Sequence, residues 1–201
     1  MDKRMDIAIK TINLFQSHPK VQNVFLRGSL HKNTNIDPYS DIDIGVDVSG
    51  YDNGKFSLEV PAIMRSHFDV LFFDWSPSLL PDQYVQSYVI KGTPIFWLID
   101  IQCMANPHVS SIQNIRNDFY EHLLKLWILN LKYYLRGNSE ALKDIHKLGF
   151  RTFKEDVSYN SIYEILFNIL LEIRSNTHPN LHEFLDQCET TILDHKYRLQ
   201  S

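Results

Sequence analysis

The stretch that decides the fold reads FLRGS at residues 25–29 and, after a polar loop, SDIDIGVDV at residues 40–48. The first part is short, rich in residues that favour β-strands, and stops at a Gly-Ser pair. From Asp41 to Val48 the second part alternates strictly between β-branched residues and polar or small ones. Because successive strand side chains point to opposite faces, Asp41 and Asp43 share one face and the isoleucines share the other. The two parts therefore predict two strands joined by a loop.

These residue types suit phosphate chemistry. Carboxylates at positions i and i+2 of a strand lie about 7 Å apart along the chain, so Asp41 and Asp43 can hold Mg²⁺ together with substrate phosphates. Gly28 lets the backbone approach a phosphate closely, and Ser29 offers a hydroxyl and an amide to phosphate oxygens. An Asp-x-Asp pair alone is most often a solvated strand edge. Its conjunction with the Gly-Ser pair, in this order, is far more specific.

A third carboxylate lies on a later predicted strand. Residues 68–73 read FDVLFF, with Asp69 set between apolar neighbours. Asp74 follows on the same strand and faces the opposite side by alternation. Asp69 is therefore the candidate to join the pair on residues 40–48.

The segments on residues 25–29, 40–46 and 68–70 resemble the signature of the nucleotidyltransferase superfamily, whose fold is shared with DNA polymerase β. The family pattern is an apolar residue before Gly-Ser, a loop, Asp-apolar-Asp-apolar, and then apolar-Asp-apolar on a neighbouring strand. The resemblance covers roughly residues 20–75, and residues 94–99 fit the next family strand. It implies transfer of a nucleoside monophosphate, AMP by expectation, from a nucleoside triphosphate such as ATP, with two Mg²⁺ ions and release of pyrophosphate.

The resemblance also implies a role for each motif residue. Gly28 and Ser29 would hold the triphosphate. Asp41 and Asp43 would bind the metal ions. Asp69 would complete one metal site and could assist deprotonation of the acceptor hydroxyl.

One departure from the family pattern follows the Gly-Ser pair. Many members have Arg and Gly soon after it, whereas residues 30–33 of this chain read LHKN. Lys32 is our candidate for supplying the missing positive charge to the nucleotide, and Arg27 is another.

The rest of the chain predicts an α+β protein in two parts. Residues 1–105 are expected to form the catalytic domain, a nucleotidyltransferase-like mixed β-sheet with flanking helices, and residues 106–201 a C-terminal helical bundle. Helices are expected at residues 7–17, 83–90, 112–135, 139–148, 162–173 and 181–199, with a possible short helix at 56–66 broken by Pro61 and a strand at 94–99. A small catalytic domain followed by helices is similar to the aminoglycoside and lincosamide nucleotidyltransferases.

The composition of the chain favours some classes of acceptor molecule over others. The net charge is −4, without the basic excess by which nucleic-acid binders neutralise phosphates, so nucleic acid is disfavoured. A negative surface favours a cationic small molecule, and an aminoglycoside-type acceptor is the leading hypothesis. Two alternatives stay open: nucleotidylation of a partner protein, as in toxin–antitoxin pairs, and an inactive nucleotide-binding relative that serves in interactions. The acceptor, the nucleotide used and the oligomeric state are left open.

The N-terminus is charged and has no signal-peptide core, and no apolar run reaches the roughly 18 residues of a membrane span, so a cytoplasmic protein with no membrane partner is expected. The two cysteines, Cys103 and Cys188, have no metal-type spacing and are expected to be reduced thiols.

Overall fold

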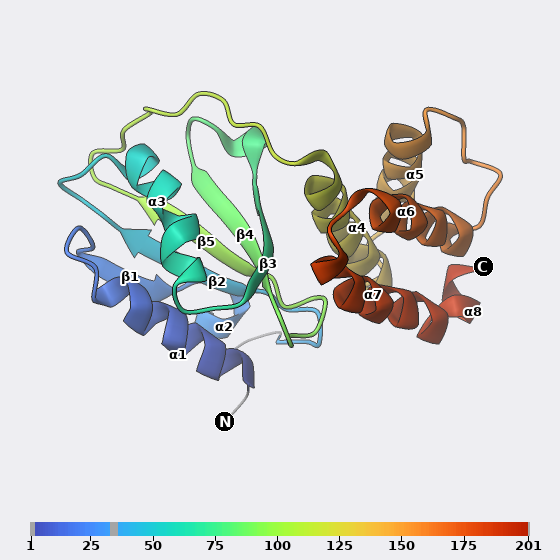
Figure 1. Ribbon diagram of the computed structural model, residues 1–201, viewed down its shortest axis with the longest axis horizontal. Helices are drawn as coiled ribbons and strands as arrows, with labels where there is room; N and C mark the ends of the chain where they lie inside the picture. Colours follow the sequence, from blue (N-terminus) through green and yellow to red (C-terminus); the bar gives the residue numbers. More distant parts are fainter. Residues whose placement is uncertain (1–2, 33–35, 201) are drawn as a thin grey trace. The chain divides into compact units, whose positions relative to one another are not determined.

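The computed structural model describes residues 3–32 and 36–200, and these form an α+β protein with a five-stranded mixed sheet and eight α-helices (Figure 1). The expected α+β class is therefore confirmed. Contacts divide the chain into two compact units, one of residues 1–93 with 97–117 and one of residues 94–96 with 118–201. Residues 106–117, which the sequence pattern groups with the helices, lie in the first unit.

The sheet belongs to the first unit, and its strand order is not the order of the chain. Its strands follow one another in space as β1-β2-β5-β4-β3. β2 and β5 run parallel, and the other neighbouring strands run antiparallel. The strands are β1 (Asn23–Leu26), β2 (Ile42–Asp47), β3 (Val70–Trp75), β4 (Tyr84–Ile90) and β5 (Ile99–Met104).

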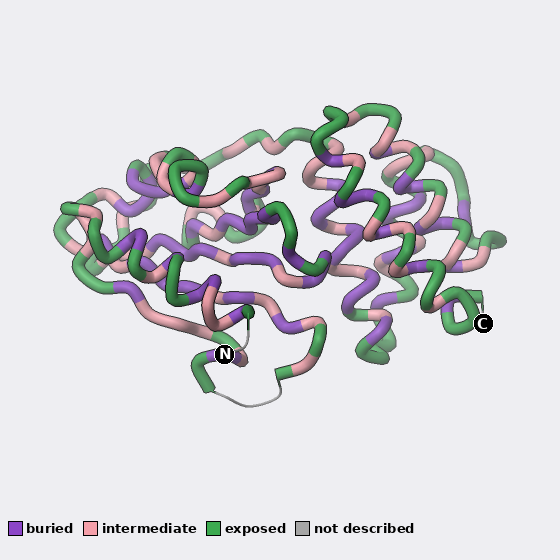
Figure 2. Tube along the Cα trace, turned by 60° about the horizontal axis from the view of Figure 1, so that its bottom comes forward, coloured by how far each residue is buried: buried purple, intermediate pink, exposed green. Residues whose placement is uncertain are grey.

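Two helices pack with one face of this sheet into a single apolar core. They are α1 (Lys3–Gln16) and α3 (Asn53–Arg65), and their buried residues join the alternate isoleucines of β2 and β5 (Figures 1 and 2). A short helix, α2 (Gly28–Lys32), follows β1 directly. Because strand side chains alternate, the other face carries the residues that lie between these isoleucines, the aspartates among them.

Three local predictions were wrong. Residues 84–90, expected as a helix, form the interior strand β4, because their aromatic and β-branched residues pair with β3 on one side and β5 on the other. The strand expected at residues 94–99 begins only at Ile99. The helix expected from residue 112 begins at Phe119, where the Asp118 side chain accepts from the amides of the first turn.

The helix α3 continues through Pro61 without a break. Proline has no N–H, so the carbonyl four residues earlier, that of Ser57, loses its intrahelical donor. Gln86, almost fully buried on β4, donates its Nε2 to the Ser57 oxygen at 2.5 Å. The sheet therefore supplies the hydrogen bond that the proline removes.

The second unit is helical. Its helices are α4 (Phe119–Leu135), α5 (Ala141–Phe153), α6 (Ile162–Asn176), α7 (His182–Asp194) and α8 (Lys196–Leu199), and the chain also has 3₁₀ turns at Pro77–Leu79 and Pro179–Leu181. α4 packs on α5 and α6, and Trp127 Nε1 donates to the Leu166 carbonyl at 2.9 Å. A capping box begins α6 at Ser161. Within residues 3–32 and 36–200, no helix combines the length and apolarity that a bilayer crossing needs.

Candidate functional site

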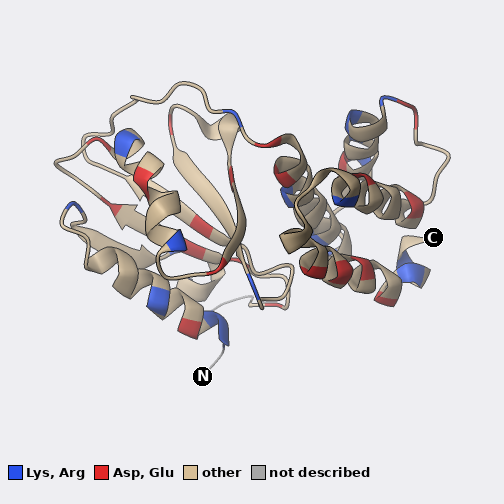
Figure 3. Ribbon diagram, in the orientation of Figure 1, with Lys and Arg blue, Asp and Glu red and all other residues tan. Residues whose placement is uncertain are grey.

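The parallel pairing of β2 with β5 sets two aspartates side by side. Asp43 lies opposite Asp100, and the flanking pairs are Ile42 with Ile99 and Ile44 with Ile101. Neighbouring strands lie about 4.8 Å apart, and paired residues share a face, so both carboxylates stand on the face away from the isoleucine core. Figure 3 shows acidic segments, in red, on neighbouring strands of the sheet.

Further polar residues extend this row across the sheet. Asp41 directly precedes β2, and alternation places it on the same face as Asp43. On the other side of Asp100, the register continues to Ser87 on β4 and then to Asp74 on β3, both of them buried. We call the face that carries Asp41, Asp43 and Asp100 the carboxylate face.

Gly28 lies directly against this face. Its φ is +58°, and a Cβ added to it would lie 2.0 Å from Asp43 Oδ2, so no other residue fits without displacing that carboxylate. The amide of Arg27 donates to the Asp43 carbonyl at 2.8 Å and fixes the junction between β1 and α2. Ser29 follows in α2, and Lys32 is exposed at the end of that helix.

Replacing Gly28 with Ala tests this contact. The left-handed conformation alone costs about 1–2 kcal/mol for a residue with a Cβ, and the collision with Asp43 adds to that. Gly50→Ala is the matched control, because Gly50 has φ +92° but no atom within 4 Å of an added Cβ. We expect urea unfolding to show a loss of stability in both variants, and only Gly28→Ala to lose affinity for a magnesium nucleotide. Equal nucleotide affinity in the two variants would contradict the contact.

Asp69, the third carboxylate expected from the sequence, does not join this cluster. It directly precedes β3, the edge strand, and its carbonyl accepts from the Lys91 amide at 2.8 Å. β5 and β4 separate β3 from β2, which corresponds to about 14 Å across the sheet. Asp100 occupies the neighbouring position instead. Sequence reasoning missed it, although residues 99–101 show the same apolar-Asp-apolar pattern that marked Asp69.

The electrostatics of the carboxylate face favour a cation. Asp100 Oδ1 is buried and accepts no hydrogen bond from any residue the structure describes. A buried anionic oxygen without a donor is costly, and the neighbouring charge of Asp43 repels it. In the described part of the chain, no three His, Cys, Asp or Glu side chains form a ready-made metal site. Mg²⁺ does not require one, because it keeps several waters and uses one or two carboxylates plus substrate phosphates.

The loop before Asp41 is held by a residue from α1. Arg4 Nη1 donates to the Asp37 carbonyl at 2.6 Å and to the Ser40 carbonyl at 3.4 Å. The same guanidinium lies 5.0 Å from the centroid of the Trp97 ring. These contacts fix the approach of the chain to β2 and hence the position of Asp41.

The cysteines do not contribute to this site. Both are free and buried. Burial raises the pKa of the Cys103 thiol far above its ordinary value, so this thiol stays protonated and is a poor metal ligand or nucleophile.

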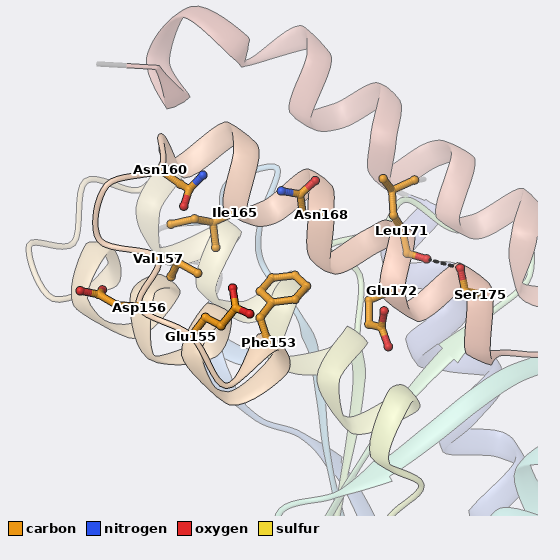
Figure 4. A pocket seen from close by; sticks show the side chains of 10 residues that line it. All are labelled: Phe153, Glu155, Asp156, Val157, Asn160, Ile165, Asn168, Leu171, Glu172 and Ser175. Carbon is orange, nitrogen blue, oxygen red and sulfur yellow. Dashed lines mark hydrogen bonds between the residues drawn. The ribbon is translucent and has the colours of Figure 1, made fainter.

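The second unit contains a cavity of about 540 Å³ between the end of α5, the following loop and α6 (Figure 4). Three of its lining residues are acidic, namely Glu155, Asp156 and Glu172, and among the described residues no Lys, Arg or His lines it. None of the motif residues Gly28, Asp41 and Asp43 lines this cavity.

A scan against models of known protein families finds no match for this chain, and a search of curated proteins finds none either. The assignment of a function therefore rests on the chemistry of the site. Paired carboxylates beside a glycine turn can hold divalent cations against a phosphate chain.

Proposed function

We propose that this protein is a magnesium-dependent nucleotidyltransferase that moves a nucleoside monophosphate, AMP by preference, from a nucleoside triphosphate to a hydroxyl of a small-molecule acceptor. The observation that supports this most is the register that sets Asp43 beside Asp100, with the backbone of Gly28 pressed against Asp43. The motif resemblance assigns the same chemistry to Gly28-Ser29 and Asp41-x-Asp43.

The carboxylate face suits the required metal. Asp100 Oδ1 has no donor among the described residues, and a cation would satisfy it. When bound, two Mg²⁺ ions would clamp the attacking and leaving oxygens of the in-line displacement. We assign Asp41, Asp43 and Asp100 to hold them, with Asp100 in the role that the motif resemblance gives to Asp69.

The remaining residues of the motif hold the nucleotide in this proposal. The absence of a side chain at Gly28 lets the backbone approach the phosphates, and Ser29 offers donors to their oxygens. The acceptor hydroxyl then gives its proton to Asp100 and its oxygen attacks the α-phosphorus, the bond between the α-phosphorus and the oxygen bridging to the β-phosphate breaks, and pyrophosphate leaves. Holding reactants in line in this way can itself lower the barrier by several kcal/mol.

The proposal extends to the finer fold. The antiparallel pair β1–β2 and the parallel pair β2–β5, together with α3, would form a catalytic domain of the DNA polymerase β type, and α4–α8 would form the C-terminal bundle. The net charge of −4 supports a cationic acceptor, such as an aminocyclitol, over nucleic acid.

The experiment that tests this function measures pyrophosphate release. The protein is incubated with Mg²⁺, each of the common nucleoside triphosphates and a panel of hydroxylated amines. We expect release that requires Mg²⁺ and one class of acceptor, and that prefers ATP. A panel in which no combination raises pyrophosphate above the protein-free control would count against the proposal.

A further inference from the structure

The side chain of Arg27 lies on the carboxylate face because Gly45 of β2 has no side chain to obstruct it. The Arg27 side chain leaves the end of β1 and crosses β2 at Gly45. A Cβ added to Gly45 would lie 3.1 Å from Arg27 Cδ and 2.6 Å from Phe25 Cζ. A larger residue at this position would therefore displace the Phe25 ring and crowd the Arg27 side chain.

The Arg27 guanidinium contacts neutral amide side chains at β5, the strand beside β2. Arg27 Nη1 donates to Gln102 Oε1, and Gln102 Nε2 donates to Gln83 Oε1 at 3.3 Å. Gln102 is mostly buried, with 9 % of its surface exposed, and lies opposite Gly45 in the register. The head of Arg27 is therefore placed over β5 by groups that carry no charge.

The positive charge of Arg27 is not compensated by an ion pair. No carboxylate oxygen lies within 4.0 Å of its guanidinium in the described ranges 3–32 and 36–200. A guanidinium stays ionised and carries five N–H donors, of which Gln102 takes one. Those that remain form a fork that matches the oxygens of a phosphate.

The guanidinium of Arg27 lies close to the carboxylates of the carboxylate face. Gln102 follows Asp100 by two residues on β5, so their side chains share a face and lie about 7 Å apart along the strand. A phosphate chain whose reacting end lies at Asp43 and Asp100 can extend toward Gln102. The two carboxylates can hold cations, and the guanidinium beside them has no ion pair with any residue that the structure describes. Together these groups are complementary to a polyphosphate with its bound cations.

We propose that Arg27 is the residue that binds the β- and γ-phosphates of the nucleoside triphosphate, and that Gln102 is its positioning residue. The proposal rests on the proposed function. It assigns to Arg27, rather than to Lys32, the positive charge that the family pattern carries after its Gly-Ser pair. Lys32 lies exposed at the end of α2 and has no contact that directs it to the carboxylate face in the described residues.

The test is the affinity of the full chain for magnesium tripolyphosphate and for a magnesium complex of a non-hydrolysable ATP analogue, measured by calorimetry. Arg27→Gln should weaken both by about tenfold to a hundredfold, as expected for loss of a charge-assisted contact. Arg27→Lys should restore part of the loss. Arg65→Gln is the matched control, because Arg65 stacks on Phe73 at the end of α3 and its charge should not matter.

Gln102→Leu tests the positioning role. It removes the acceptor for Arg27 without changing charge, so we expect a loss of affinity of only a few-fold. In the Arg27→Gln background, the same change should have no further effect, because the group it positions is already gone. Melting curves without ligand check that each variant is folded, and a purely structural role for Arg27 would lower them without changing the affinity of the folded protein.

Each outcome decides something different. If the natural protein binds neither magnesium ligand, the proposed function and this inference both fail. If it binds them and a folded Arg27→Gln binds equally well, the inference fails and the proposed function stands. Loss of affinity in Arg65→Gln equal to that in Arg27→Gln would also overturn it, because the effect would then come from net charge alone.

Discussion

Replacement of Asp43 by Ala is expected to lower nucleotide transfer by about a thousandfold or more, because electrostatic stabilisation of the transition state is usually the largest single contribution to catalysis. Asp43 is the residue that the structure ties to both halves of the site. It pairs with Asp100 across β2 and β5, and its Oδ2 lies against Gly28. Without it, a divalent cation would lose a ligand and the phosphates would lose the charge that balances them.

The control for this variant removes a carboxylate elsewhere in the same unit. Asp82 is exposed in the loop before β4, and Asp82→Ala should leave transfer unchanged. Pyrophosphate release by the two variants, each shown to be folded by its melting curve, gives the comparison. If a folded Asp43→Ala variant keeps more than about a tenth of the natural rate, the carboxylate face does not carry out the transfer.

The second large effect distinguishes Asp100 from Asp69. Both residues lie between apolar neighbours, but only Asp100 is brought beside Asp43. We expect Asp100→Asn to lower transfer by about a hundredfold or more, on the scale of losing one preorganised electrostatic group, and Asp69→Asn to leave it nearly unchanged.

Stability separates loss of catalysis from loss of folding in the Asp100 variant. Asp100→Asn removes a buried anionic oxygen that has no donor among the described residues, so the free energy of unfolding without Mg²⁺ should stay equal or rise. Urea unfolding measures this directly. If Asp69→Asn were inactive and Asp100→Asn fully active, the assignment of the third carboxylate to β5 would be wrong.

The sequence predicted the local arrangement of the candidate site and missed the arrangement that depends on long-range strand pairing. Strict alternation at residues 41–48 placed Asp41 and Asp43 on one strand face, because the side-chain period of a strand is a local property. The partner of Asp43 is set by the pairing of β2 with β5, whose residues lie more than fifty positions apart in the chain. No local pattern decides which of two similar segments, one at Asp69 and one at Asp100, lies next to β2.

The predicted orientation of Asp74 was wrong because of a shift in strand register. Alternation from Asp69 placed Asp74 on the opposite face of its strand, but the pairing of β3 with β4 shifts between Val70 and Phe72. One irregular position reverses the parity of every residue after it. Asp74 lies opposite Ser87, in the same row as Asp100.

Pairing also explains the missed strand. The segment YVQSYVI at Tyr84–Ile90 has the length and apolar content of either a short helix or a buried strand. The segment forms a strand because β3 and β5 each supply a row of backbone hydrogen-bond partners to it.

The phosphate that reaches the acceptor distinguishes nucleotidyl transfer from other phosphoryl transfers, and it can be measured directly. The protein is incubated with Mg²⁺ and ATP labelled either at the α-phosphate or at the γ-phosphate, and the label on the acceptor is followed. A nucleotidyltransferase acting through Asp41, Asp43 and Asp100 places the α-label on the acceptor and releases the γ-label as pyrophosphate. Transfer of the γ-label, or transfer of the α-label that survives in Asp43→Ala, would contradict the account.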